Sequence, residues 1–375
     1  MIPYGHHDID EDDVAAVSAV LRGEWLTTGP VLEQFEADLR GFTGGTPVVA
    51  VSSGTAALHV AYAAAGVGPG DEVITPPMTF IATQATAVAL GATIVFADVC
   101  SDTANIDPGA VEAAITSRTK AIVAVDYAGH PADMDALRAI ADQHGLILIE
   151  DAAHSLGSTY KGRPVGSLAD ITAFSFFPTK NITTAEGGAV AVRDAATLQR
   201  AREFARQGLV REPSRHRITG EGPWHQEVHA FGLNYRLPDV LAALGSSQLT
   251  RLAAFKARRA EVKASHDAAF AGRADLEIPA QRPHVDPMWH LYPLRVPVNR
   301  RRAVFERLRE VGVGVQVNYL PAYWHPAFAD LGFPRGLCPV AEEFYRREIS
   351  LPMSTTLTDE QVAVVGDAVI ASLEH

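Results

Sequence analysis

The sequence is poor in cysteine and contains no long apolar run. Its two cysteines, Cys100 and Cys338, exclude a disulfide framework and a cysteine-rich metal site, which is typical of proteins from a reducing compartment. No apolar run approaches the roughly 18 residues that a membrane-spanning helix needs. The first residues also lack the basic and apolar regions of a secretory signal. We therefore expect a soluble, cytoplasmic protein.

Positive charge is also scarce. The 375 residues carry 32 basic and 44 acidic side chains, for a net charge of −12. Nucleic acids and membrane surfaces are polyanions, so this balance excludes a general binder of either and predicts no such partner. Hydrophobic residues make up 47% and charged residues 20%, as in globular enzymes.

The first two-thirds of the chain alternate short apolar runs with helical patterns. This alternation predicts an α/β fold with a mostly parallel sheet and helices on both faces. We expect a large domain over residues 1–247 and a smaller α+β domain over residues 248–375. The predicted strands of the large domain cover residues 47–51, 71–74, 92–96, 121–125, 146–150, 171–176 and 188–192.

The remaining third has a different character. We expect one long helix over residues 248–270, strands over 289–296 and 314–319, and a helix over 301–310. A further helix is predicted to open at Phe344 and to end before Ser350.

Lysine is rare, and one lysine stands out. Four of the five lysines lie in turns, at a junction or on a charged helix face, as surface residues do. Lys180 instead follows the apolar strand ITAFSFF and precedes small polar residues. A desolvated lysine there has a lowered pKa and is a candidate nucleophile toward an aldehyde, although a structural loop lysine is the alternative.

Asp151 ends another predicted strand, and His154 follows three residues later. Ligands of open α/β sheets bind at the carboxyl ends of strands, where a buried carboxylate needs a cation. A helix-capping Asp with a core His is the competing interpretation. A metal site is disfavoured because no third ligand is near.

Two further loops complete a pattern. Ser53, Gly54 and Thr55 join a strand to a helix start, a geometry that suits a phosphate but also ordinary capping, and Ser175 adds a hydroxyl. Phe80 follows a proline-rich turn and is either core filling or a platform for a flat ring. A lysine, a carboxylate, a phosphate loop and a stacking ring together are what pyridoxal 5′-phosphate requires.

The motifs in their order along the chain resemble the DegT/DnrJ/EryC1/StrS sugar aminotransferases, which are fold-type I pyridoxal-phosphate enzymes. The resemblance spans nearly the whole chain and rests on SSGTAAL, TPPMTFIAT, VDYAGHPADM, IEDAAHSLGS, FSFFPTKNITTAEGGA and GLNYRLPDVLAALGSSQL. Four other segments look most like the 4-aminotransferase branch of pseudaminic acid biosynthesis; they are IPYG, EWLTTGP, GPW and AEEFYRREISLPM.

The resemblance implies roles for individual residues. Lys180 would form the Schiff base with the cofactor, Asp151 would pair with the pyridine nitrogen, and His154 would lie at the ring. Ser53, Gly54, Thr55 and Ser175 would hold the phosphate, and Phe80 would stack on the ring. Asn234 would reach the cofactor phosphate of the neighbouring subunit in a homodimer with shared active sites. The substrate-site residues implied by the branch are Tyr4, Glu24, Trp25, Leu26, Thr27, Ser53, Ser175, Val315, Gln316, Val317 and Asn318, so residues 1–30 would contribute to that site.

The implied reaction moves an amino group, with glutamate as the expected donor, to C4 of a UDP-linked 4-keto-6-deoxy-N-acetylhexosamine. Another 3- or 4-aminotransferase acting on a GDP- or dTDP-sugar is the alternative. The family often has His at the positions of Phe177 and Asn318, and the second departure touches the proposed substrate wall.

Three other functions conflict with residues of this sequence. A dehydratase of the family carries His in place of Lys180, and a fold-type I lyase needs a reactive cysteine loop that Cys100 and Cys338 do not form. A non-catalytic sugar-nucleotide-binding regulator would have lost Lys180 or Asp151. A basic segment with Arg211, Arg215, His216 and Arg217 is either a solvated loop or a contact to the diphosphate of a neighbour's substrate.

Overall fold

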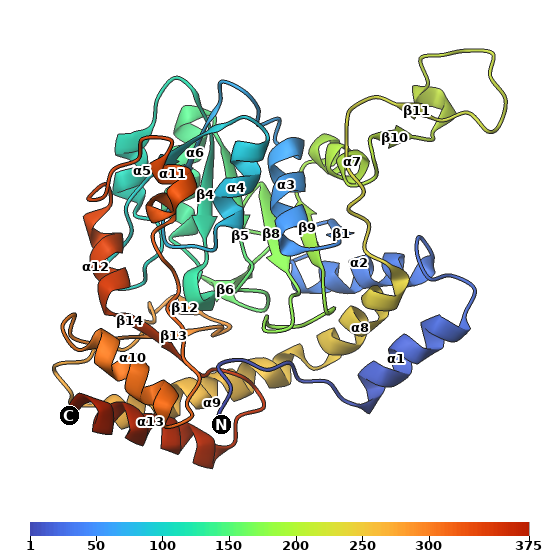
Figure 1. Ribbon diagram of the computed structural model, residues 1–375. Coiled ribbons are helices and arrows are strands. Elements are labelled where there is room, and N and C mark those ends of the chain that lie inside the picture. The colour runs from blue at the N-terminus through green and yellow to red at the C-terminus, as the bar shows by residue number, and fades with distance from the viewer. Residues whose placement is uncertain (375) are drawn as a thin grey trace.

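A seven-stranded sheet forms the centre of the molecule, as seen in a computed structural model that describes residues 1–374 (Figure 1). Its strand order is β1-β9-β8-β5-β4-β2-β3. The bounds are β1 (Val48–Val51), β2 (Glu72–Thr75), β3 (Thr93–Phe96), β4 (Thr119–Val125), β5 (Ile147–Asp151), β8 (Ile171–Ser175) and β9 (Gly188–Val192). All seven strands predicted from the sequence are present.

The sheet is mostly parallel, as predicted. Neighbouring strands from β3 through β2, β4 and β5 to β8 pair in parallel, whereas β9 pairs antiparallel with both β8 and β1. Most strand residues are buried because both faces are covered, and this is why the strands read as continuous apolar runs. Because β5 and β8 pair in parallel, their carboxyl ends are adjacent. Asp151 is the last residue of β5, and Lys180 follows β8.

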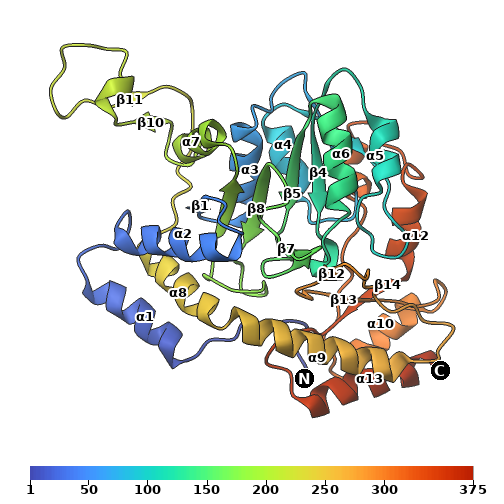
Figure 2. The ribbon, with the colours of Figure 1, turned by 180° about the vertical axis from the view of Figure 1, so that it is seen from behind.

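Helices cover both faces of the sheet (Figures 1 and 2). One face packs on α3, α4 and α7, and the other on α2, α5, α6 and α8. Side chains of successive strand residues alternate between the two cores, so Val49 and Val51 join one core while Val48 and Ala50 join the other. The bounds are α2 (Pro30–Phe42), α3 (Gly54–Ala64), α4 (Ala82–Ala89), α5 (Pro108–Ala114), α6 (Met134–His144), α7 (Ala195–Phe204) and α8 (Asp239–Thr250).

A second, smaller core lies beyond the sheet. It gathers residues of α9, α10 and α13 around the antiparallel pair β13 and β14, together with Ile2 from the N-terminal segment. The bounds are α9 (Leu252–Phe270), β13 (Tyr292–Arg295), α10 (Arg301–Glu310), α12 (Pro339–Arg347), β14 (Glu348–Leu351) and α13 (Asp359–Glu374). The predicted division at residue 247 falls within α8 and stays a prediction.

Short elements complete the described chain. They are α1 (Glu11–Arg22), the 3-10 turns η1 (Tyr127–Gly129), η2 (Pro213–Arg215) and η3 (Ala322–Trp324), the helix α11 (Pro326–Ala329), and the strands β6 (Thr159–Tyr160), β7 (Arg163–Pro164), β10 (Leu209–Val210), β11 (Glu227–Val228) and β12 (Val285–Asp286). Among residues 1–374, no helix combines the length and the apolar character needed to cross a membrane.

The helix predicted over residues 248–270 is present as α9 and ends at Phe270 as predicted, but it begins four residues later, at Leu252. The chain breaks at Arg251, whose φ of −101° and ψ of 0° leave the helical region, so α8 ends at Thr250 and α9 begins at Leu252. The break has a partner in the N-terminal segment, since the Arg251 guanidinium forms ion pairs with Asp8, Asp10 and Asp13.

Two C-terminal predictions were wrong. Residues 314–319 form no strand, and only Gln316 pairs, with Ser350. The Asn318 amide donates to the Glu348 carboxylate rather than to a neighbouring strand. The helix predicted to open at Phe344 begins earlier, at Pro339, because proline is favoured in the first helical turn, and it gives way to β14 at Glu348.

Candidate functional site

A cavity of about 430 Å³ lies at the carboxyl ends of β5 and β8. This is the edge at which open α/β sheets bind ligands. The predicted site residues that line it are Tyr4, Ser53, Gly54, Thr55, Phe80, Asp151, His154, Ser175, Lys180 and Asn318. Segments from residue 4 to residue 318 thus converge on one space.

Lys180 follows the end of β8 and is half-buried. A tight turn places it there, because its amide donates to the Phe177 carbonyl at 2.8 Å. Burial lowers the pKa of Lys180 to about 8, while the nearby Asp151 carboxylate opposes that shift. Lys161, by contrast, forms an ion pair with Asp135 on the surface. Lys180 is therefore the lysine whose amine is poised to lose its proton near neutral pH.

Asp151 is the last residue of β5 and is only 5% exposed. Thr83 donates a hydrogen bond of 2.6 Å to its Oδ2, and the Ala153 amide donates one of 3.2 Å to Oδ1. Burial raises the pKa of Asp151, and these two donors together with Lys180 act in the opposite direction. A cationic ring N–H facing this carboxylate would stabilise its ionised form.

His154 lies beside Asp151 and is 6% exposed. The Tyr319 hydroxyl lies 3.2 Å from its Nε2, and the His290 ring stacks at a tilt with centroids 4.3 Å apart. Its Nδ1 is buried with no hydrogen-bond partner within the described chain. Burial holds the pKa of His154 well below its usual range, so the ring is neutral. An unpaired polar atom at a cavity wall indicates that a ligand belongs there.

The N-terminus of α3 opens onto the same cavity. The Ser53 hydroxyl accepts from the Ala56 amide at 3.0 Å, which caps the helix. The amides of Gly54 and Thr55 have no acceptor among residues 1–374 and present the positive end of the helix. A Cβ on Gly54 would lie 2.7 Å from the Ser175 side chain, so only glycine permits this close approach of the helix to β8. This arrangement is suited to bind a phosphate group.

Phe80 is 58% exposed, which excludes simple core filling. Its ring meets the Tyr319 ring edge-on, with centroids 6.3 Å apart. Phe177, at the position where the family often has His, is 46% exposed and also lines the cavity. The exposed face of Phe80 is available to stack on a flat ligand.

Tyr4 and Asn318 form the far wall. The Asn318 side-chain amide donates to the Tyr4 hydroxyl at 2.6 Å and to the Ser350 hydroxyl at 3.0 Å. Beneath them, burial raises the pKa of Glu348 to about 8. This wall joins the N-terminal segment to the smaller core.

Several predicted substrate residues do not line the cavity of a single chain. Val315 is completely buried in the smaller core, because its side chain points away from the site. The other predicted substrate residues outside the cavity lining are Glu24, Trp25, Leu26, Thr27, Gln316 and Val317, and Asn234, which was predicted to reach the cofactor phosphate of the neighbouring subunit, lies outside it as well. Trp25 and Leu26 are both more than half exposed. Sequence reasoning also missed three residues of the site, which are Thr83, His290 and Tyr319; Thr83 lies at the end of the motif TPPMTFIAT.

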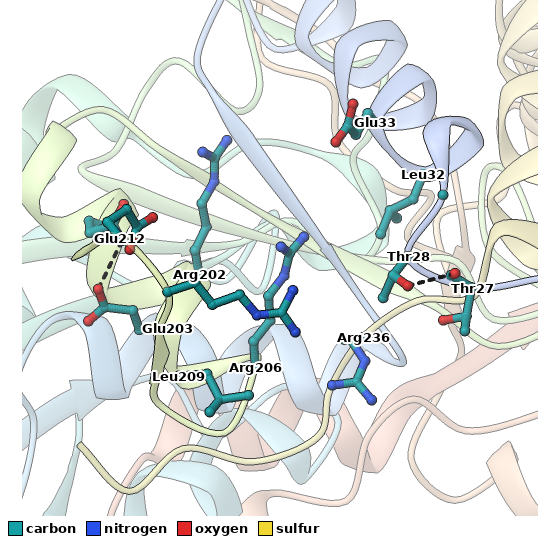
Figure 3. Close-up of a pocket in the computed structure, with 13 residues that line it drawn as sticks. Thr27, Thr28, Leu32, Glu33, Arg202, Glu203, Arg206, Leu209, Glu212 and Arg236 are labelled. Atoms are coloured by element: carbon teal, nitrogen blue, oxygen red, sulfur yellow. Dashed lines mark hydrogen bonds between the residues drawn. The ribbon is translucent and has the colours of Figure 1, made fainter. Parts of the chain in front are cut away.

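A second cavity, of about 580 Å³, lies between α2, α7 and the segment before α8 (Figure 3). Thr27 lines it, together with Arg202, Arg206, Arg211 and Arg236. None of these four arginines forms an ion pair with a carboxylate in the part of the chain that the structure describes. Arg215, which the sequence grouped with Arg211, is instead paired with Glu203 and Glu212. The carboxylates of Glu33, Glu203 and Glu212 line the cavity too, but two of them are engaged by Arg215, so the four arginines without an ion pair are suited to bind an anion.

Residues 7–370 match the DegT/DnrJ/EryC1/StrS aminotransferase family. The chain belongs to this family. The spore coat polysaccharide biosynthesis protein SpsC of Bacillus subtilis (strain 168) is 39% identical over 374 residues, which cover 98% of this chain and 96% of SpsC.

Solved aminotransferase structures agree with this fold. Spr1654 of Streptococcus pneumoniae in its PMP form superposes with a TM-score of 0.94 at 32% identity, covering 100% of this chain and 99% of that one. PseC of Helicobacter pylori, an aminotransferase involved in the biosynthesis of pseudoaminic acid, superposes with a TM-score of 0.92 at 32% identity and the same coverage. The expected fold-type I architecture is confirmed, and the chain is a sugar aminotransferase of the DegT/DnrJ/EryC1/StrS family.

Pyridoxal phosphate is the cofactor of this DegT/DnrJ/EryC1/StrS protein, since Spr1654 is solved in both a PLP form and a PMP form. The residues here fit that group. The free amides at Gly54 and Thr55 suit its phosphate, His154 lines the cavity with one ring nitrogen unpaired, and Asp151 offers a carboxylate to a ring nitrogen.

Proposed function

We propose that this protein transfers an amino group from glutamate to C4 of a UDP-linked 4-keto-6-deoxy-N-acetylhexosamine. The observation that carries the transfer chemistry is the placement of Lys180 and Asp151 in one cavity with the free N-terminus of α3. The choice of sugar rests on the segments IPYG, EWLTTGP, GPW and AEEFYRREISLPM, and PseC supports it as a structural relative.

The protein's own groups have separate tasks in this reaction. When bound, pyridoxal phosphate supplies the electron sink and carries the amino group. Asp151 would provide the negative charge opposite the ring nitrogen. The Thr83 hydroxyl and the Ala153 amide donate to its carboxylate and fix its orientation. Lys180, with a pKa near 8, accepts and returns protons near neutral pH. The α3 amides and Ser175 anchor the phosphate end.

We further propose that the active site is shared between two subunits of a homodimer. Asn234 is exposed and lies outside the cavity of its own chain. The segment around it carries exposed apolar side chains, with Phe231 97% and Trp224 78% exposed, which are costly to leave in water. Figures 1 and 2 show this hairpin, with β10 and β11, projecting away from the body. A second copy of the chain is the partner that would cover it.

The arginine-lined cavity completes this proposal. Thr27 of the segment EWLTTGP lines it, so a predicted substrate segment and four unpaired arginines share one space. We assign it to the diphosphate of the nucleotide sugar, held across the subunit interface. Of the basic segment suggested by the sequence, Arg211 lines this cavity, and Arg202, Arg206 and Arg236 join it there.

The decisive experiment is a panel of UDP-, GDP- and dTDP-linked 3-keto and 4-keto sugars, incubated with the protein and glutamate. An amine at C4 of the UDP-linked 4-keto-6-deoxy sugar, seen by NMR of the product, supports the proposal. Turnover of a 3-keto dTDP-sugar with none of the UDP compound would overturn the substrate while leaving the aminotransferase chemistry in place.

A further inference from the structure

The projecting hairpin between β10 and β11 has almost no apolar core. Among residues 211–230 the only buried side chain is that of Glu227, and the large apolar residues Ile218, Trp224 and Val228 are all more than half exposed. A two-stranded hairpin is marginally stable in water without further support. Within a single chain, the polar contacts of Glu227 are therefore the buried interactions that order the hairpin.

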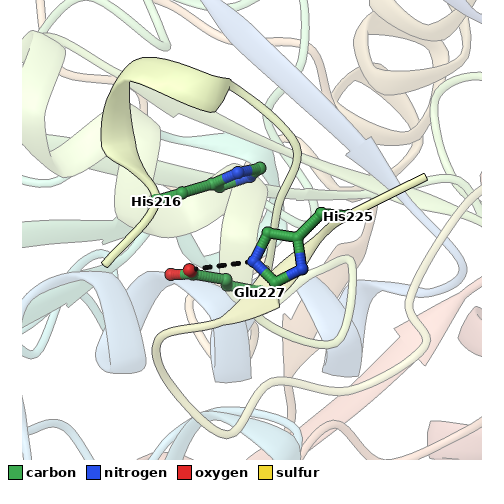
Figure 4. A group of neighbouring side chains, drawn as sticks. All are labelled: His216, His225 and Glu227. Atoms are coloured by element: carbon green, nitrogen blue, oxygen red, sulfur yellow. Dashed lines mark hydrogen bonds and ion pairs between the residues drawn. The ribbon is translucent and has the colours of Figure 1, made fainter. Parts of the chain in front are cut away.

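Three imidazoles surround this carboxylate. The Nε2 of His225 lies 3.1 Å from Oε1 of Glu227, and the Nε2 of His229 lies 2.5 Å from Oε2. The ring of His216 stands perpendicular to that of His225, with centroids 4.8 Å apart. One ligand atom each from His216, His225 and Glu227 lies within 4.8 Å of the others (Figure 4).

We propose that His216, His225 and Glu227 bind a divalent transition-metal ion of the zinc class and so close the hairpin. Two imidazole nitrogens and one carboxylate oxygen are a ligand set that zinc accepts, with a fourth position left for water or another group. Ligand atoms around a tetrahedral zinc lie roughly 3.3 Å apart, given metal–ligand bonds of about 2.0 Å. The separation between His225 and Glu227 meets that requirement, and a small movement of His216 completes it.

The surroundings of the three ligands support this assignment. The Nε2 of His216 lies 3.3 Å from the Val210 carbonyl, and metal-binding histidines commonly use one ring nitrogen to bond a carbonyl while the other binds the ion. The amides of Arg217 and Ile218 donate to Glu227 and fix its orientation.

The site links positions at both ends of the hairpin. His216 follows η2, whereas His225 and Glu227 lie at the return strand. A metal ion that binds the folded hairpin but not the unfolded hairpin stabilises the folded form by mass action. The proposal is independent of the substrate and of the cofactor, because none of the three ligands lines the cavity at Lys180.

Zinc titration by calorimetry tests this directly, with tag-free protein first treated with EDTA and then freed of the chelator. We expect one saturable Zn²⁺ site per chain. His225→Gln and Glu227→Gln should each weaken binding by at least about 10–100-fold. Even the loss of a residue that only hydrogen-bonds a metal ligand has an effect of this size. The stacked pair His6 and His7 offers a rival site, so a variant with both changed to Gln must keep the affinity.

A second readout follows the hairpin itself. Trypsin should cleave after the exposed Arg211 and Arg217 more slowly when Zn²⁺ is added, and the protection should vanish in His225→Gln. Co²⁺ bound in place of Zn²⁺ should give the d–d absorption of a four-coordinate ion in the wild type but not in His225→Gln. The proposal is overturned if wild type shows no saturable binding, or if binding survives His225→Gln and is lost with the His6 and His7 changes.

Discussion

Thr83 donates a 2.6 Å hydrogen bond to the carboxylate of Asp151, and this bond joins α4 to the end of β5 across 68 residues of sequence. It is one of two donors that hold the carboxylate in place inside a buried environment, the other being the Ala153 amide. Thr83 is thus a positioning residue for the group that we expect to face the cofactor ring.

We predict that Asp151→Asn lowers transamination by several orders of magnitude. Removing one partner of a buried charge pair costs about 3–5 kcal/mol, which corresponds to a rate loss of roughly 10²–10⁴-fold. Thr83→Val should cost less, about 1.5–3 kcal/mol, because the carboxylate stays but loses one donor. Single-turnover rates with glutamate measure both. A near-normal rate for Asp151→Asn would mean that another group governs the ring.

We predict that Lys180 bonds the cofactor. Borohydride reduction followed by peptide mapping should place the pyridoxyl group on Lys180, and Lys180→Ala should stop turnover even if the phosphate contacts still retain cofactor. Lys256→Ala is the matched control, since that lysine is paired with Asp286 on the surface. A label found on any other lysine would refute the assignment.

The lowered pKa of Lys180 predicts a pH dependence. The neutral amine is the reactive form, so the rate at which apoprotein bonds pyridoxal phosphate should rise with pH and level off above about 8. Asp151 stabilises the ammonium form, so Asp151→Asn should move the midpoint to lower pH. Stopped-flow absorbance over a pH series measures this. A midpoint near the ordinary value of about 10.4 would contradict the burial of this amine.

Subunit mixing tests the shared active site. Lys180→Ala and Asn234→Ala parents should each be inactive, and a heterodimer regains one site with both residues intact. After full random exchange of equal amounts, activity should return to about a quarter of wild type. Native mass spectrometry confirms the exchange. If exchange is complete and no activity returns, each site is built from one chain.

The arginine cavity predicts a selective loss of substrate affinity. Arg206→Gln should raise KM for the nucleotide sugar by roughly 10–100-fold, as expected for a lost hydrogen bond between charged groups, with little change in the half-reaction with glutamate. Arg302→Gln is the control, because Arg302 is 89% exposed and pairs only with Glu306. Equal effects on both half-reactions would indicate that Arg206 serves the fold rather than the substrate.

Much of the site was predictable because it lies where strands end. The sequence pattern alone located β5 and β8, and so indicated that Asp151 and Lys180 would share one edge of the sheet. Ser53, Gly54 and Thr55 were similarly placed by the strand-to-helix transition at β1 and α3. Local hydrophobic periodicity carries this information, because each strand must bury both faces.

Other features depended on contacts between distant segments. The break at Arg251 could not be predicted locally, since both flanking segments are helical and the reason for the break is an ion-pair set with residues 8–13. The orientation of Val315 into the smaller core and the hydrogen bonds of Asn318 to Tyr4 and Ser350 likewise join segments far apart in the chain.

The sequence by itself determined the sheet, its helical layers and the places of Lys180 and Asp151 after the ends of strands, because these follow from short-range patterns of burial and turn residues. Only the tertiary structure decided which arginines share a cavity, and that Arg215 is already neutralised by Glu203 and Glu212. It also decided that three histidines meet at Glu227. Charges and ligands act over a few ångströms in space, and the chain's path, not its residue order, sets those distances.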